Sequence, residues 1–134
     1  MSARERPRFL LDTHTFLWMA TDPGRLGPGA RERVEAVGSV LLLSLASVWE
    51  MAIKSSLGKL ELPATLKAFL AEQLQATRTL LLDVRLEHVL RVERLPFHHR
   101  DPFDRLLAAQ AVVEHVPVLS ADPDFDAYPV DRVW

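Results

Sequence analysis

Arg100-Asp-Pro-Phe-Asp-Arg-Leu-Leu-Ala-Ala-Gln-Ala111 is the stretch of this 134-residue chain around which its other acidic positions make sense. Asp101 followed by Pro102 predicts an N-cap and a first helical residue, where the missing proline N–H costs nothing. Asp104 then lies in the first turn, where free N–H groups and the helix dipole favour an anion. The apolar residues behind it predict a buried helix from Pro102 to about His115. A carboxylate at such an N-terminal turn suits a metal or phosphate site. The open alternative is capping alone, which is the favoured interpretation for Asp101.

Size and composition indicate one globular domain spanning residues 1–134, because 49% of the residues are apolar and 25% are charged. There is no cysteine, which excludes disulfides and thiolate zinc sites. No apolar run approaches the ~20 residues that span a bilayer, and the first residues lack the apolar core of a signal peptide. We therefore expect a cytoplasmic protein with no membrane partner. The net charge of −2 means that binding to nucleic acid would depend on a metal ion and a few local Arg or Lys residues.

Apolar runs of strand length alternate with helical patterns, which predicts the α/β class with a mainly parallel sheet. The predicted strands cover residues 8–11, 40–43, 79–82, 116–119 and 130–133. Pro117 indicates an irregular or edge position for the fourth of them. The predicted helices cover residues 13–20, 28–36, 45–57, 63–76, 86–95 and 102–115, and a short helix follows Ser120.

Four acidic residues from distant segments are predicted to meet at one edge of this sheet. In open α/β sheets ligands bind outside the carboxyl ends of the strands. Asp12 ends the first strand, Asp122 follows the fourth, and Asp104 opens the helix that leads into the fourth. Glu50 lies about 9 Å along the helix that Ser44 caps, at ~1.5 Å per residue, and its long side chain can reach back over the edge. Because crowded carboxylates repel, the cluster needs a cation, and oxygen ligands suit Mg²⁺ or Mn²⁺.

The chemistry follows from such a cation. A carboxylate-held Mg²⁺ can activate a water molecule, orient it toward a phosphodiester and neutralise the developing charge, with one or two ions. No protein nucleophile is needed, in agreement with the absence of cysteine and of a Gly-x-Ser-x-Gly motif. The absence of a Gly-rich phosphate loop argues against an ATPase or a dinucleotide enzyme.

Four motifs together resemble the PIN-domain ribonucleases, and in particular the VapC-like toxins of bacterial type II toxin–antitoxin pairs. They are Leu10–His14 (LLDTH), Ser47–Lys54 (SVWEMAIK), Arg100–Ala111 and Ser120–Phe125 (SADPDF), and in order they span essentially the whole chain. The resemblance implies a three-layer α/β/α fold, Mg²⁺- or Mn²⁺-dependent endoribonuclease activity that leaves a 5′-phosphate and a 3′-hydroxyl, a homodimer and a cognate antitoxin. It also implies that the metal-binding, catalytic acids are Asp12, Glu50, Asp104 and Asp122. Ser120 would occupy a hydroxyl position, often Thr in the family, that positions these acids.

Each acid also has a purely structural interpretation. Asp12 and Asp122 can cap the helices that follow them, and Glu50 can pair with Lys54 four residues on, which is worth a few tenths of a kcal/mol. Asp124 and Asp101 are secondary candidates that could hold a metal-bound water or only cap a helix.

Arg100 and Arg105 flank the expected cleft and are the candidates for substrate-phosphate contacts, although they could equally be a solvent-facing pair. His98 and His99 fit solvated loop residues better than general bases. His14 is a minor candidate for a substrate contact. Trp18, Trp49, Phe69 and Leu70 fit a core or a dimer interface better than base-stacking positions, and an apolar groove along residues 28–37 or 44–57 could receive the antitoxin.

Two rival functions remain open. One is a catalytically silent binding module of the same fold, which Mg²⁺ titration with RNA would distinguish. The other is a phospho-accepting signalling domain, which needs an acidic pair at the first strand and a late lysine. Only Asp12 ends the first strand and no lysine follows Lys67, so this rival ranks last.

Overall fold

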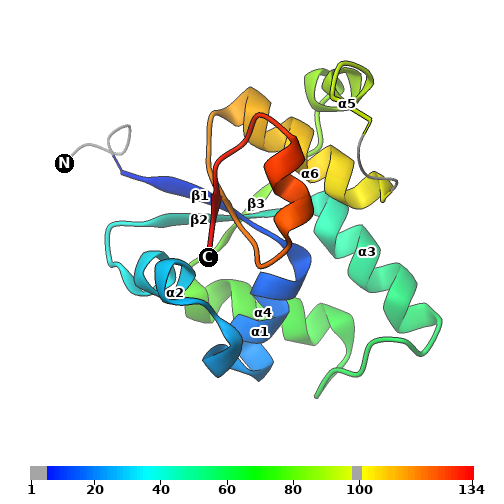
Figure 1. Ribbon diagram of the computed structural model, residues 1–134. Helices are drawn as coiled ribbons and strands as arrows, with labels where there is room; N and C mark the ends of the chain where they lie inside the picture. Colours follow the sequence, from blue (N-terminus) through cyan, green and yellow to red (C-terminus); the bar gives the residue numbers. More distant parts are fainter. Residues whose placement is uncertain (1–5, 98–100) are drawn as a thin grey trace.

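A five-stranded, entirely parallel sheet forms the centre of the computed structural model, which describes residues 6–97 and 101–134. The strands are β1 (Arg8–Leu11), β2 (Val40–Ser44), β3 (Leu80–Leu82), β4 (Val118–Leu119) and β5 (Arg132–Val133). Their order in the sheet is β3-β2-β1-β4-β5, so β1 lies at the centre (Figure 1). The register places Leu11 beside Leu43 on one side and beside Leu119 on the other.

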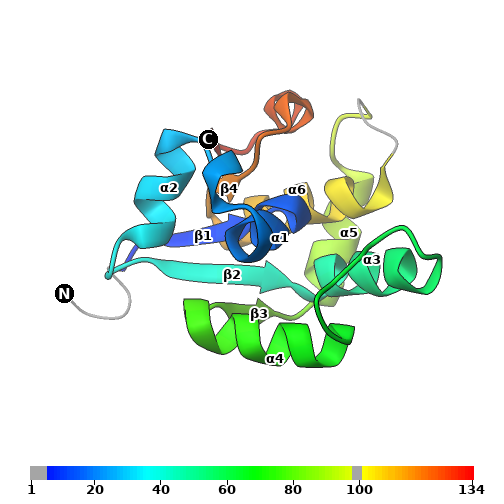
Figure 2. The ribbon, with the colours of Figure 1, turned by 90° about the horizontal axis from the view of Figure 1, so that it is seen from below.

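Helices cover both faces of the sheet, which confirms the predicted three-layer arrangement. They are α1 (Thr13–Thr21), α2 (Pro28–Glu35), α3 (Leu45–Ser56), α4 (Leu66–Thr77), α5 (Leu86–Glu93) and α6 (Pro102–Glu114), with 3₁₀ turns η2 (Pro23–Arg25) and η3 (Pro123–Ala127). Figure 1 shows α5 and α6 on one side of the strands and α1 and α4 on the other, and Figure 2 shows β2 between β1 and β3.

Side chains alternate between the two faces along the strands, as a pleated backbone requires. Leu10 packs with Leu107 of α6 in one apolar core, whereas Leu11 packs with Phe16 of α1 in the other. The side chains of Leu10 and Leu11 are both fully buried. Burial on both faces explains the continuous apolar run that marks this strand in the sequence.

Two of the predicted elements need correction. The predicted helix from Pro63 begins only at Leu66, because the Thr65 hydroxyl accepts a hydrogen bond from Ala68 N at 3.2 Å and caps it. The fourth strand is neither four residues long nor at an edge. It covers Val118–Leu119 between β1 and β5, and Pro117 precedes it, where its carbonyl still accepts a hydrogen bond from Leu10 N. No helix in the described part of the chain is long and apolar enough to cross a membrane.

Candidate metal centre

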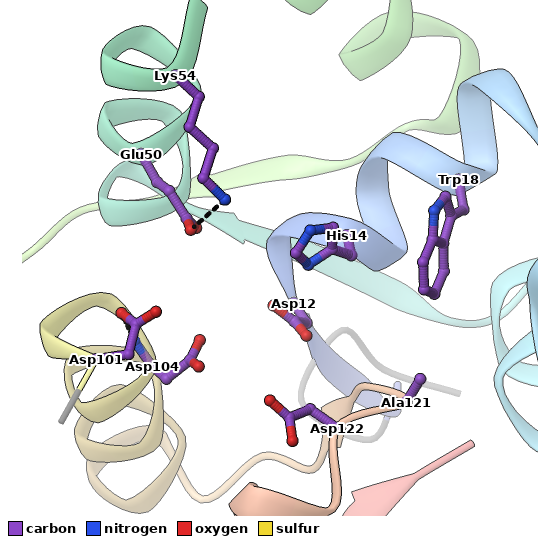
Figure 3. A pocket seen from close by; sticks show the side chains of 9 residues that line it. All are labelled: Asp12, His14, Trp18, Glu50, Lys54, Asp101, Asp104, Ala121 and Asp122. Carbon is purple, nitrogen blue, oxygen red and sulfur yellow. Dashed lines mark hydrogen bonds and ion pairs between the residues drawn. The ribbon is translucent and has the colours of Figure 1, made fainter. Parts of the chain in front are cut away.

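One cavity of about 330 Å³ lies beyond the carboxyl end of β1 and brings the four predicted acids together (Figure 3). Three helices and one loop contribute its walls. The lining residues are Asp12, His14, Trp18, Glu50, Lys54, Asp101, Asp104, Ala121 and Asp122. The prediction that Glu50 reaches back from within its helix to join Asp12 thus agrees with the geometry.

Asp12 is held at the junction of β1 and α1, and only 7% of it is exposed. Its Oδ2 accepts a hydrogen bond of 2.7 Å from Ser120 Oγ, the hydroxyl just after β4. The same Oγ accepts a hydrogen bond from Asp122 N at 3.0 Å. Burial raises the pKa of Asp12, and the Ser120 hydrogen bond opposes that rise only in part. Ser120 therefore links two of the acids, in the place expected of it.

Glu50 is held by α1 and by its own helix. Its Oε1 accepts a hydrogen bond of 2.7 Å from the Thr13 hydroxyl, which also lies 2.9 Å from Ser47 Oγ. Its Oε2 lies 3.0 Å from Lys54 Nζ (dashed line in Figure 3). Glu50 thus makes the expected pair with Lys54, and it also lines the cavity together with Asp12.

The other aspartates open short helical segments at the cavity. Asp101 Oδ1 accepts hydrogen bonds from Phe103 N at 2.8 Å and Asp104 N at 3.3 Å, so it caps α6 as expected. Asp122 caps η3 by accepting a hydrogen bond from Asp124 N at 2.9 Å, yet it also faces the cavity. Asp124 is exposed and does not line the cavity.

The structure does not bring Arg105 to the cavity. Its side chain is buried, and Nη2 and Nη1 donate hydrogen bonds of 2.9 Å to the carbonyl oxygens of Val92 and Pro96. Arg105 therefore ties α6 to the end of α5, and it is not positioned for the expected phosphate contact. Arg100, with His98 and His99, lies outside the described residues.

Two residues at this centre have only a weak signal in the sequence. Thr13 positions Glu50 although the two are 37 residues apart, and its signal was only a hydroxyl directly after Asp12. Lys54 was interpreted only as a partner of Glu50, yet it lines the cavity and its side chain is 38% exposed.

A second group of metal-ligand residue types lies elsewhere, between α5 and α6, and comprises Glu87, His88 and Glu114. Glu114 already lies near three basic groups: Arg8 Nη2 at 3.3 Å, His88 Nε2 at 2.9 Å and the guanidinium of Arg85. Although burial opposes it, hydrogen bonds from His88 and Arg8 and the charge of Arg85 hold the pKa of Glu114 below its ordinary value. We interpret this group as an ion-pair network that joins α5 to α6.

The residues around the cavity fit a hard divalent cation. Their donors are carboxylate oxygens, the ligands that Mg²⁺ and Mn²⁺ prefer. Asp12 is nearly buried in the presence of like charges, and its carboxylate accepts a hydrogen bond from a neutral hydroxyl, that of Ser120. A buried carboxylate in this setting is stabilised by a cation.

Fold and centre together define an α/β/α domain with an acidic centre beyond the carboxyl ends of parallel strands. The PIN domain family model matches residues 9–131, and the chain belongs to that family. Two solved structures share the fold. VapBC2 from Rickettsia felis, bound to a DNA fragment from its promoter, is 14% identical, with a TM-score of 0.70 over 95% of this chain and 99% of that chain. FitAcB from Neisseria gonorrhoeae is 22% identical, with a TM-score of 0.57 over 92% of this chain and 95% of that one. No curated protein matches the chain in sequence.

Proposed function

We propose that the protein is a metal-dependent endoribonuclease and the toxin of a toxin–antitoxin pair, acting in the cytoplasm. The observation that carries the proposal is the gathering of four carboxylates, from four separate segments, around one cavity of about 330 Å³. Membership of the PIN family supports nuclease chemistry. Two similar folds come from structures whose names pair a toxin with an antitoxin, which supports the second half of the proposal.

In this proposal Asp12, Glu50, Asp104 and Asp122 hold Mg²⁺ or Mn²⁺. Bound there, the cation supplies the positive charge that activates water and neutralises the phosphodiester as it is hydrolysed to a 5′-phosphate and a 3′-hydroxyl. The protein's own contribution is to fix the acids. Ser120 orients Asp12 by the hydrogen bond to Oδ2.

Lys54 contributes the one cationic side chain described on the cavity wall. In the metal-free protein it neutralises Glu50 at 3.0 Å. With a cation held by the acids, Glu50 would not need Lys54 as its partner, and the flexible Lys54 ammonium would be free to bind a substrate phosphate. We therefore assign to Lys54 the phosphate contact that Arg105 is not placed to make.

The antitoxin is proposed to bind the groove that adjoins α2. This groove has a volume of about 420 Å³ and is lined mainly by apolar groups that include Met19, Leu26 and Val34. It lies along residues 28–37, one of the two docking surfaces that the sequence leaves open, the other being residues 44–57. An amphipathic antitoxin helix would cover these side chains.

The homodimer is proposed to form through α5, whose outer face exposes Leu86, Val89 and Leu90. These residues recur at helical spacing and make one apolar stripe. Residues at equal distances on either side of Val89 carry opposite charges. Arg85 and Glu93 are each four residues from Val89, and Glu87 and Arg91 are each two residues from it. A second copy in antiparallel orientation would thus place opposite charges together, as a two-fold interface allows.

Cleavage of a single-stranded RNA by the purified protein, titrated with Mg²⁺ or Mn²⁺, tests the activity. We expect metal-dependent cleavage that Asp104→Asn abolishes while the thermal unfolding curve stays two-state. Asp126→Asn is the matched control, because Asp126 is an exposed carboxylate paired with Arg132 at 3.0 Å and does not line the cavity. Cleavage by Asp104→Asn at the wild-type rate would refute the site, and RNA binding without turnover at any metal concentration would favour the silent binding module.

A further inference from the structure

The cavity has two unlike walls. The acids come from the junction of β1 and α1, from α3, from α6 and from the loop after β4, whereas further along α1 the wall is formed by the rings of His14 and Trp18 (Figure 3). These two residues are four apart on α1 and so lie on one helix face. The buried side of the same helix carries Thr15 and Phe16, which are fully buried. The two rings are therefore turned toward the cavity by the amphipathic character of α1.

His14 and Trp18 are the first members of a row of aromatic contacts, His14–Trp18–Trp134, that leads away from the acids. The His14 and Trp18 centroids are 5.7 Å apart with planes tilted by 37°. Trp18 and Trp134 are 5.8 Å apart in an edge-to-face arrangement. The Arg25 guanidinium carbon lies 4.2 Å from the Trp18 ring centroid. These spacings are those of favourable aromatic and cation–π contacts.

Trp134, at the far end of this row, is held in place by the start of α2, and it therefore fixes Trp18 before any ligand binds. The Trp134 carbonyl accepts hydrogen bonds from Gly29 N at 2.7 Å and Ala30 N at 3.0 Å, at the start of α2. A Cβ at Gly27 would lie 2.6 Å from Trp134 Cδ1, so glycine is required there. Trp134 is thus seated against the backbone, and Trp18 packs on it.

From this geometry we propose that His14 and Trp18 form a stacking subsite for an unpaired nucleobase next to the phosphodiester that is cut. The ligand class is single-stranded RNA, because bases in a duplex have no free faces to stack on side chains. The inference rests on the proposed function and identifies how the same site recognises its substrate.

Charge supports the need for such a subsite. A protein of net charge −2, with a cluster of acids at its centre, lacks the broad basic surface from which most nucleic-acid binders gain affinity. Stacking on aromatic rings supplies affinity that does not depend on net charge, and it tolerates different bases. Arg25, stacked on Trp18, adds a cation beside the rings where the backbone of the strand would pass.

Metal-free binding separates this inference from the catalytic proposal. Fluorescence titration of the Asp104→Asn protein in EDTA with short oligo(A) and oligo(U) measures the dissociation constant directly. We expect quenching of tryptophan emission, and about five- to 150-fold weaker binding for Trp18→Leu, the range that corresponds to loss of one stacked base. Trp49→Leu is the control, because Trp49 is 61% exposed but does not line the cavity, and its binding should stay within about twofold.

His14→Ala provides a second variant that does not risk the fold, because His14 is an exposed residue. We expect it to raise KM for RNA cleavage with little change in kcat, since a stacked base is bound equally before and during the reaction. Trp18→Phe should restore most of the binding that Trp18→Leu loses, and duplex RNA should compete poorly.

Wild-type binding by both Trp18→Leu and His14→Ala would overturn the subsite even if the protein cleaves RNA. Loss of antitoxin binding in Trp18→Leu with RNA binding unchanged would likewise overturn it, and would assign these rings to the protein partner. Conversely, Trp18-dependent binding of oligoribonucleotides by a protein that never cleaves them would uphold the subsite while the nuclease proposal fails.

Discussion

Replacing Thr13 by valine tests whether a buried hydroxyl positions Glu50 for the metal. Thr13 is 2% exposed, and its Oγ1 donates a 2.7 Å hydrogen bond to Glu50 Oε1. Valine has nearly the same shape, so Thr13→Val removes the hydrogen bond without opening a cavity. A hydrogen bond to a charged group contributes about 1.5–3 kcal/mol. We expect the metal-free protein to lose free energy of unfolding in that range.

The same substitution should weaken the metal site. Loss of a residue that orients a metal ligand typically costs 10- to 100-fold in metal affinity. At saturating Mg²⁺ the extra stability conferred by the ion would then fall by about 1.4–2.7 kcal/mol, since each factor of ten corresponds to about 1.4 kcal/mol. Isothermal titration with Mn²⁺ measures the affinity, and urea unfolding in EDTA and in Mg²⁺ measures the stability.

Thr15→Val is a closely matched control on the same helix. Thr15 is also fully buried, but its hydroxyl donates a 2.7 Å hydrogen bond to the Leu119 carbonyl, not to an acid. That carbonyl also accepts a hydrogen bond from Asp12 N, so it keeps a partner in the variant. We expect a loss of about 1 kcal/mol in stability and no change in Mn²⁺ affinity. Equal effects of the two substitutions on Mn²⁺ binding would refute the reasoning.

Three further expectations follow from the same contacts. Ser120→Ala should raise the pKa of Asp12 further and weaken Mn²⁺ binding about 10- to 100-fold, whereas Ser120→Thr, which keeps the hydroxyl, should bind nearly as the wild type does by calorimetry. Because the folded-state pKa of Glu114 is lowered from its ordinary 4.5, its contribution to stability is present above that pH and is lost as the pH falls through the folded-state value. Glu114→Gln should therefore cost about 1–3 kcal/mol at pH 7 and flatten the acid limb of a pH series of urea unfolding curves, and an unchanged limb would contradict the ion-pair network. Glu87→Arg should weaken the proposed dimer about tenfold in sedimentation equilibrium, because two exposed pairs of about 0.2–1 kcal/mol become repulsive, and adding Arg91→Glu should restore it.

The sequence predicts best what depends on a few neighbouring residues. The first strand has its predicted bounds, Arg8–Leu11, and β2 extends only one residue beyond the predicted 40–43, to Ser44. The Asp101-Pro102 pair correctly locates the start of α6. Asp12, Asp104 and Asp122 follow from those boundaries, since each lies at a strand end or a helix start, whereas Glu50 lies inside α3 and was placed by the length of its side chain. The order of the strands is not local information. The inner position of β4 was therefore missed, although Pro117 was correctly expected to break its regularity.

Arg105 shows why the direction of a side chain is harder to predict than its position. It follows Asp104 directly, and adjacent residues on a helix point about 100° apart at 3.6 residues per turn. Asp104 faces the cavity, so Arg105 turns toward α5, where carbonyl oxygens at its end accept from the guanidinium. Proximity in sequence suggested a phosphate contact, whereas helix geometry makes Arg105 a brace between two helices. Thr13 was missed for the converse reason, because its partner is distant in sequence.

The register of the sheet fixes the position of Asp12 relative to Ser120. Leu11 pairs with Leu119, so the next residues, Asp12 and Ser120, emerge side by side, and Asp12 N donates to the Leu119 carbonyl at 3.1 Å. Both leucines are fully buried, and burying such a side chain contributes about 1.5–3 kcal/mol. A slip of one residue between β1 and β4 would turn one of these two leucines to the opposite face, so the core holds the register firmly. The apolar packing of Leu11 and Leu119, one residue earlier in each segment, thus fixes the hydrogen bond from Ser120 to Asp12. Repulsion among the acids could separate Asp12 from Ser120 only by disrupting this packed core, and not merely by moving a flexible loop.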